Sequence, residues 1–190
     1  MFTDPKQTTI NKLKDHGFGI ITVDENGTTT LQYSCIPLAQ HISERALEAE
    51  IQGLTTKLKV CFKSAHATYR TNQGQGLQEA GQIIEALVNC MAKESVRLGF
   101  GTGVLRSAAA DTIDNLYGLS PLKDHRAALG GARSFIKTYR NVSSHAPRSA
   151  REAMDKIKKC RAGFFDAIRI AKDLQGAMKA KGMRTSIHLT

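Results

Sequence analysis

The sequence predicts a mainly helical protein, an antiparallel helical bundle with a small β-hairpin appended at its N-terminal end. Three observations predict this fold class. After Pro37, apolar residues recur in alternating steps of three and four, the spacing of one face of an α-helix. Short breaks rich in glycine or marked by proline separate these stripes. Before Pro37, β-branched residues flank an Asn-Gly pair, a pattern typical of a hairpin.

Length and composition fit one globular domain. The chain has 190 residues, of which 41% are hydrophobic and 23% charged. We expect an N-terminal segment with the hairpin over 1–36, a helical bundle domain over 37–182 and a flexible tail over 183–190. No stretch approaches the roughly 20 consecutive apolar residues of a membrane-spanning helix. The N-terminus has no signal pattern, so we expect a cytoplasmic protein.

The hairpin is expected over residues 18–34. Phe18–Asp24 and Thr28–Tyr33 would be its strands, joined at Glu25-Asn26-Gly27. Asn-Gly favours a two-residue turn because both residue types tolerate a positive φ.

The first half of the bundle shows two apolar stripes separated by a break at 71–76 and followed by a second break at 99–103. The glycines of the second break would also suit a phosphate-binding loop, but no Lys-Ser or Lys-Thr follows them, so we interpret the break as a loop between helices. The first stripe comprises Leu47, Ile51, Leu54, Leu58, Cys61, Ala65 and Tyr69, and the second comprises Leu77, Ala80, Ile84, Leu87, Met91 and Leu98.

The second half predicts three further helices. A short helix is expected over 105–117. Ser120 and Pro121 then resemble an N-cap followed by proline in the first helical position. The helix that follows would turn Leu129, Ala132, Ile136 and Tyr139 inward. The last helix should begin near Pro147 and bury Ala153, Ile157, Cys160, Phe164, Ala167, Ala171, Leu174 and Met178.

The excess of positive charge is confined to the last third of the chain. Between Lys123 and Arg184 there are 16 lysines and arginines and 5 aspartates and glutamates, a net charge of +11. The rest of the chain holds 11 lysines and arginines and 12 aspartates and glutamates, a net charge of −1, so the whole chain carries a net charge of +10. Such a block favours a polyanionic partner, and we expect nucleic acid rather than a merely solvated helix face.

Cysteines and carboxylates give no sign of a metal or acid–base centre. The four cysteines are scattered, and we expect reduced, mostly buried thiols. Asp111 and Asp114 would share a helix face, which we interpret as exposed polar surface. Five histidines fit surface or capping positions, and His145 is the exception. We therefore expect no metal and no cofactor.

His145 belongs to the segment Arg140-Asn141-Val-Ser143-Ser-His145. In an unbroken helix Asn141 and His145 would share one face, whereas Arg140 would lie about 140° away from His145. Two arrangements would let the side chains of Arg140 and His145 contact the same atom of a bound molecule. Either the helix ends before Ser143 and the chain turns back, or two protomers pack these segments together. Pro147 supports a break in the helix.

These residue types suit RNA cleavage without a metal. A neutral imidazole at His145 can take the proton of a ribose 2′-hydroxyl. The guanidinium of Arg140 can hold phosphate oxygens, and Asn141 can orient either group. The products would be a 2′,3′-cyclic phosphate and a 5′-hydroxyl. Further RNA contacts are expected from Lys137, Ser144 and Arg148.

The pattern of Arg140, Asn141 and then His145 between two helices of a small basic bundle resembles the signature of the HEPN superfamily of ribonucleases. Closest in appearance is the C-terminal module of abortive-infection proteins. The resemblance covers roughly residues 65–180. It implies a helical bundle that forms a homodimer, with two motifs in one shared metal-independent site. It also implies a role in antiviral defence or as a toxin, with an inhibitory or antitoxin protein as a possible partner. The segments that carry this wider resemblance are Ala80–Leu87, Gly118–Pro121, Leu129–Gly131 and Tyr139–Asn141.

Three alternatives stay open. The segment could be structural, with Arg140 neutralising a helix C-terminus and Ser144 or His145 capping the next helix. The protein could bind nucleic acid through backbone phosphates without cleaving it. It could also bind a protein partner, as an antitoxin or adaptor does.

Overall fold

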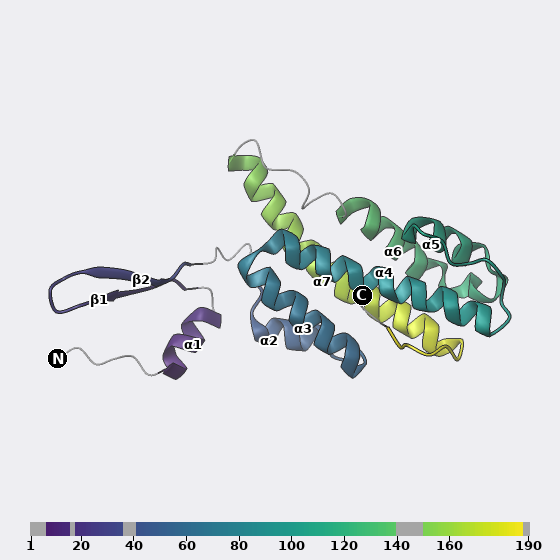
Figure 1. Ribbon diagram of the computed structural model, residues 1–190, viewed down its shortest axis with the longest axis horizontal. Helices are drawn as coiled ribbons and strands as arrows, with labels where there is room; N and C mark the ends of the chain where they lie inside the picture. The colour runs from purple at the N-terminus through teal and green to yellow at the C-terminus, as the bar shows by residue number, and fades with distance from the viewer. Residues whose placement is uncertain (1–6, 16–17, 36–40, 140–149, 188–190) are drawn as a thin grey trace.

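The computed structural model confirms a mainly helical chain with one small sheet (Figure 1). It describes residues 7–15, 18–35, 41–139 and 150–187. Its elements are α1 (Gln7–Asp15), β1 (Ile20–Val23), β2 (Thr29–Tyr33), α2 (Glu44–Glu50), α3 (Thr56–Thr71), α4 (Gln73–Arg97), α5 (Ala109–Gly118), a 3₁₀ segment (Ser120–His125), α6 (Arg126–Tyr139) and α7 (Ala150–Ala180).

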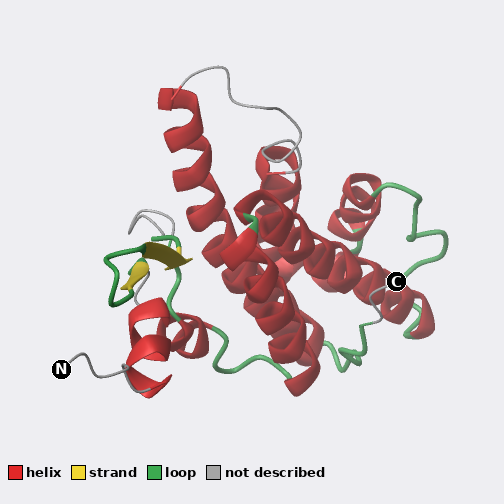
Figure 2. Cartoon of the chain, turned by 60° about the vertical axis from the view of Figure 1, so that its left-hand side comes forward, coloured by secondary structure: helices red, strands yellow, loops and turns green. Residues whose placement is uncertain are grey.

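Helix α4 is the centre of the bundle. It packs against α3, α5, α6 and α7, and α6 packs in turn on α7 (Figures 1 and 2). Its predicted apolar stripe is buried up to Met91, with Ile84, Leu87 and Met91 fully inaccessible, whereas Leu98, just beyond the helix, is half-buried. In α7, Phe164 and Leu174 are also fully buried, and the Phe164 ring packs against Phe62, His66 and Tyr69 of α3. None of the described helices is both long and apolar enough to cross a membrane.

The first predicted stripe is buried as expected except for the half-buried Cys61, but it is divided between two helices and the turn that joins them. α2 ends at Glu50 and α3 begins at Thr56, because Gly53 adopts a left-handed φ of +84°. The side chain of Gln175 in α7 holds this break from both sides. Its Oε1 accepts from the Thr55 amide at 2.8 Å, and its Nε2 donates to the Gly53 carbonyl at 3.0 Å. A periodic stripe alone gives no sign of such an interruption.

The break between α3 and α4 is shorter than expected. Only Asn72 separates the two helices, and its side chain caps α4 by accepting a hydrogen bond from the Gln75 amide at 3.1 Å. Gly76 lets the helices approach closely, since a Cβ there would lie 2.4 Å from the Cα of Tyr69.

A histidine in α3 is buried against our expectation. We expected surface or capping positions for every histidine other than His145, yet His66 is only 4% exposed. Its Nε2 lies 2.8 Å from the Ile42 carbonyl oxygen. Its ring lies beside those of Tyr69 and Phe164. Because it faces the core from α3, it links the segment before α2 to the bundle.

The elements after α4 differ from the prediction in their boundaries. α5 begins at Ala109 rather than near 105, and Leu105 is exposed. The 3₁₀ segment begins at Ser120, so Leu119 rather than Ser120 is its N-cap, and the segment runs directly into α6 with Pro121 in its first turn. The segment after Gly182, expected to be a flexible tail, packs along α4, where Met183 and Ile187 are buried.

The hairpin is confirmed with its connection over 25–27, but these residues form one three-residue loop rather than the two-residue turn that Asn-Gly favours. Asp24 and Thr28 close the loop, with the Asp24 amide donating to the Thr28 carbonyl at 3.0 Å. The Asp24 carboxylate accepts from the amides of Asn26 and Thr28. Gly27 has a φ of +78°, whereas no described residue other than glycine has a positive φ. Such a loop, a turn followed by a left-handed glycine, is the next most common hairpin connection.

The hairpin and α1, a helix that the sequence did not predict, lie to one side of the bundle (Figure 2). β2 is exposed along its whole length. Ile21 and Leu31, which face each other across the two strands, are 63% and 60% exposed. The hairpin therefore adds little to the core of the bundle.

Candidate functional site

The predicted site falls on the connection between α6 and α7. Of its residues the structure describes only Lys137, which is exposed on the last turn of α6. The others lie outside the described residues: the predicted catalytic residues Arg140, Asn141 and His145, and the predicted RNA contacts Ser144 and Arg148.

Tyr139 fixes the point at which the chain leaves α6, one residue before Arg140. Its hydroxyl donates to the carboxylate of Asp166 in α7 at 3.0 Å, and Arg169 holds the other oxygen of that carboxylate at 2.9 Å. Burial and the neighbouring carboxylate raise the pKa of Tyr139, so the phenol keeps the proton that it donates. The entrance to the predicted motif is thus tied to α7 by a hydrogen bond.

A glycine in α7 makes room for this tyrosine. A Cβ at Gly163 would lie 2.8 Å from two ring carbons of Tyr139 and 3.0 Å from Cδ1 of Leu77 in α4. Tyr139, Gly163 and Leu77 therefore form one packed layer, which joins the end of α6 to α7 and to the first turns of α4.

The first half of α7, on the other side of the predicted motif, is rich in cations. Between Ala150 and Ala162 it carries five basic residues and only two acidic ones, Glu152 and Asp155. The basic residues are Arg151, Lys156, Lys158, Lys159 and Arg161, all exposed except the half-buried Lys156. Arg161 packs over the Phe165 ring and donates to the His41 carbonyl, so its guanidinium has a fixed position.

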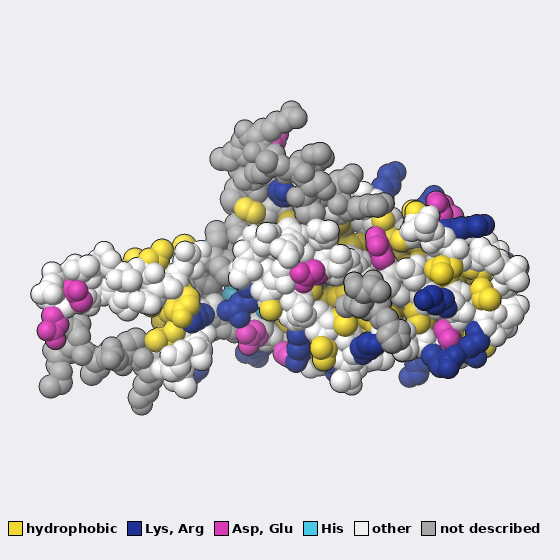
Figure 3. All heavy atoms as spheres, viewed as in Figure 1, with side chains coloured by type: hydrophobic (Ala, Val, Ile, Leu, Met, Phe, Trp, Pro, Cys, Tyr) yellow, Lys and Arg dark blue, Asp and Glu magenta, His cyan; other side chains and the backbone are white. Residues whose placement is uncertain are grey.

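Basic side chains spread over several elements of the bundle rather than forming one ridge. On the face shown in Figure 3 they gather mainly toward the end of the bundle away from the hairpin, and some acidic side chains lie among them. Several of the basic residues pair with carboxylates, among them Arg133 with Asp114 and Lys181 with Asp124.

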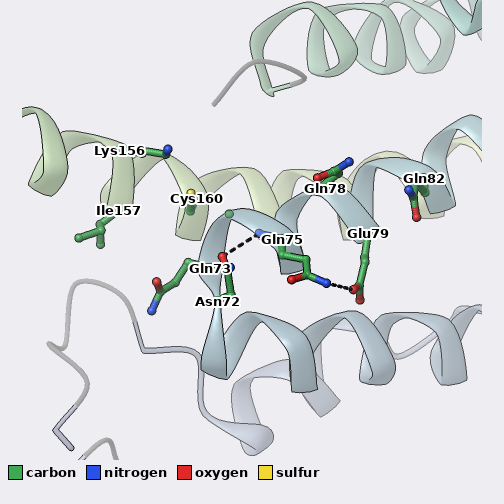
Figure 4. Close-up of a pocket in the computed structure, with 10 residues that line it drawn as sticks. Asn72, Gln73, Gln75, Gln78, Glu79, Gln82, Lys156, Ile157 and Cys160 are labelled. Carbon is green, nitrogen blue, oxygen red and sulfur yellow. Dashed lines mark hydrogen bonds between the residues drawn. The ribbon is translucent and has the colours of Figure 1, made fainter. Parts of the chain in front are cut away.

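A polar cleft lies where the start of α4 faces the first half of α7 (Figure 4). Its volume is about 690 Å³. One wall is the α3–α4 junction, with five amide side chains and one carboxylate, and the other is α7. We call it the amide cleft. Its lining residues are Asn72, Gln73, Gly74, Gln75, Gln78, Glu79 and Gln82 on the first wall, and Lys156, Ile157 and Cys160 on the second.

The sequence did not single out this cleft or the Tyr139–Asp166 contact. The five amides between Asn72 and Gln82 are a compositional signal that could have been noticed, because so many amides are unusual in one short stretch. The break at 71–76 was interpreted only as a connection. Nothing in the sequence indicates that α7 faces this stretch.

The cysteines are free, as expected, but they are less buried than expected. Cys160 is buried, Cys61 and Cys90 are half-buried, and Cys35 is exposed. Burial raises the pKa values of Cys61, Cys90 and Cys160, which makes these thiols poor nucleophiles. In the part of the chain that the structure describes, no group of three His, Cys, Asp or Glu side chains is placed to hold a metal ion.

Comparisons of the chain with protein-family models, with curated proteins and with solved structures found no match.

Proposed function

We propose that the protein is a metal-independent endoribonuclease of HEPN type, with its site at Arg140, Asn141 and His145. The observation that supports this proposal best is the setting of the segment. It joins two helices of a basic bundle, directly after the anchored Tyr139 and before the cation-rich first half of α7. Lys137 on α6 adds an exposed positive charge near the same connection.

The proposed reaction needs only groups that the chain supplies. The imidazole of His145 takes the proton of a ribose 2′-hydroxyl, and the 2′-oxygen attacks the adjacent phosphorus. The bond from phosphorus to the 5′-oxygen breaks, and this oxygen takes a proton from water. Arg140 stabilises the negative charge that develops on the phosphate oxygens. Asn141 orients the imidazole or the phosphate.

A cleavage assay on the full chain tests this proposal. Purified protein is incubated with total RNA and with purified tRNA in the presence of EDTA, and the product ends are analysed. We expect cyclic phosphate ends from the wild type, and loss of cleavage in His145→Ala and Arg140→Ala with unchanged circular dichroism. The matched controls, His125→Ala and Arg133→Ala, should cleave as the wild type does.

Two results would contradict the assignment. Equal cleavage by His145→Ala would remove the motif from the reaction. Intact RNA bound in a strongly salt-dependent manner would favour a nucleic-acid-binding module without catalysis, the second candidate that the basic first half of α7 supports.

We further propose that the cleavage is toxic to the cell that makes the protein, as in antiviral defence or a toxin–antitoxin pair. Growth arrest on expression of the wild type, relieved in His145→Ala, would support this role.

A further inference from the structure

The amide cleft adjoins the entrance of the predicted motif. Leu77, which packs against the layer formed by Gly163 and Tyr139, lies next to Gln78 in α4. Cys160, on the opposite wall, precedes Gly163 by about one helical turn. Both walls of the cleft therefore lie close, along α4 and α7, to the layer that fixes the end of α6.

The lining of the cleft is suited to the edges of nucleobases rather than to phosphates. Each glutamine side chain offers a donor and an acceptor, as base edges do. Gln78 and Gln82 are one helical turn apart and exposed, and neither is hydrogen-bonded to another residue drawn in Figure 4. The carboxylate of Glu79 can only accept, and the hydrogen bond that it accepts from Gln75 is a long one, 3.4 Å. A carboxylate repels phosphate but accepts from an amino group.

A cation on the opposite wall can complete the site. Lys156 of α7 lines the cleft, and the exposed Lys158 and Lys159 follow it on the same helix. Positive charge on α7 facing amides on α4 would let a single strand place its phosphates on one wall and its bases on the other. Proteins recognise single-stranded RNA through such splayed, unpaired bases.

We propose that the amide cleft binds unpaired bases of the RNA substrate and prefers adenine and cytosine to uracil. Gln78 and Gln82 contact the base edges, and Glu79 accepts from the exocyclic amino groups that adenine and cytosine carry and uracil lacks. Lys156 contacts a phosphate. This inference rests on the proposed function, because it takes RNA as the substrate, and it adds a specificity that the motif does not supply.

Binding of defined oligonucleotides tests the cleft separately from catalysis. Fluorescence anisotropy is measured with eight-nucleotide oligomers of adenosine, cytidine and uridine, using the full chain with His145→Ala to prevent cleavage. We expect the adenosine and cytidine oligomers to bind at least about fivefold more tightly than the uridine oligomer. Glu79→Gln, which replaces the carboxylate by an amide that can also donate, should reduce this preference to less than about twofold. The double substitution Gln78→Ala with Gln82→Ala should do the same, because it removes the groups that hold the base edges against Glu79. Lys156→Ala should weaken all three about equally.

The controls are Gln52→Ala, an exposed glutamine outside the cleft, and Lys179→Ala at the far end of α7, neither of which should change the preference. Equal affinity for the three oligomers, a preference that survives the double substitution, or no RNA binding would each overturn the inference. If the protein binds no RNA, a peptide would be the next ligand to test.

The two proposals fail in different ways. If the wild type cleaves RNA but the double substitution leaves the cleaved sequences unchanged, the cleft inference fails and the proposed function stands. If the cleft discriminates among bases but the wild type cleaves nothing, the cleft inference stands and the catalytic proposal fails.

Discussion

At the residue scale, Glu94 joins α4 to the segment that follows α7. It is only 8% exposed, and its carboxylate accepts from Arg97 at 2.6 and 2.9 Å and from the Arg184 backbone amide at 3.0 Å. These hydrogen bonds lower its pKa from 4.5 to about 2. The same interactions hold the last described residues against α4, so one carboxylate fixes two parts of the chain that are far apart in sequence.

We predict that Glu94→Gln lowers the free energy of unfolding at pH 7 by about 1 to 3 kcal/mol, because two cationic partners lose their charged acceptor. The folded pKa lies below the unfolded one, so the contribution of Glu94 is present above pH 4.5 and is lost as the pH falls toward 2. Urea denaturation at several pH values measures both effects, and the difference between the variant and the wild type should shrink in acid. Glu48→Gln, at an exposed pair with Lys63, serves as the control and should cost less than about 1 kcal/mol. An equal loss in both variants would contradict this account.

His66 makes a second prediction about pH. Burial lowers its pKa below 6.5, so the neutral ring donates to the Ile42 carbonyl in the folded protein. The unfolded chain takes up the proton more readily, and the protein should therefore lose stability as the pH falls below 6.5. His66→Leu should cost about 1 to 3 kcal/mol at pH 7.5, because the carbonyl loses its donor. It should also flatten the stability profile between about pH 7.5 and 5.5. If the stability profile of His66→Leu is as steep as that of the wild type, or as that of the control variant His125→Gln, groups other than His66 cause the pH dependence.

At the element scale, close helix contacts depend on small residues at particular positions. Gly76 faces the backbone of Tyr69, and a Cβ there would overlap three of its atoms. Gly176 lies in α7, and a Cβ there would have no atom of another element within 4 Å. We predict that Gly76→Ala destabilises the protein by about 1 to 3 kcal/mol by forcing α3 and α4 apart. Gly176→Ala should stabilise it by about 0.5 to 1 kcal/mol through helix propensity. Thermal or urea unfolding of the two variants checks the opposite signs, and a Gly76→Ala variant as stable as the wild type would exclude the close contact.

The elements show what periodicity can and cannot predict. The stripes of α4 and α7 were predicted because each continues over many turns, and in α7 the stripe faces the core from Cys160 to Met178. The division at Gly53 was missed because the residues on both sides remain buried, so the pattern continues while the backbone turns. The residues of the hairpin connection were predicted, but its turn type was not, because the Asp24 side chain closes a three-residue loop in place of the two-residue turn that Asn-Gly favours.

For the whole molecule, the sequence indicated where positive charge lies along the chain but not how the packing of the helices distributes that charge over the surface. Lys156 and Gln78 are far apart in sequence and become two walls of one cleft only because α7 packs on α4. The anchor at Tyr139 depends equally on the pairing of α6 with α7. Candidate residues within one segment can therefore be predicted from a motif, whereas groups that come from different helices require the packing.

The proposed composite site makes a prediction about the assembled protein. If Arg140 of one protomer acts with the partner's His145, a dimer of one Arg140→Ala chain and one His145→Ala chain contains one intact site and one doubly damaged site. Random mixing of the two inactive variants would then restore about one quarter of wild-type cleavage, because half of the dimers are mixed and each carries one of its two sites. Cleavage measured after unfolding and refolding the mixture checks this, with each variant refolded alone as the control. If wild-type protein refolded in the same way regains activity and the mixture gives none, Arg140 and His145 act within one chain, and the connection between α6 and α7 must turn back to bring them together.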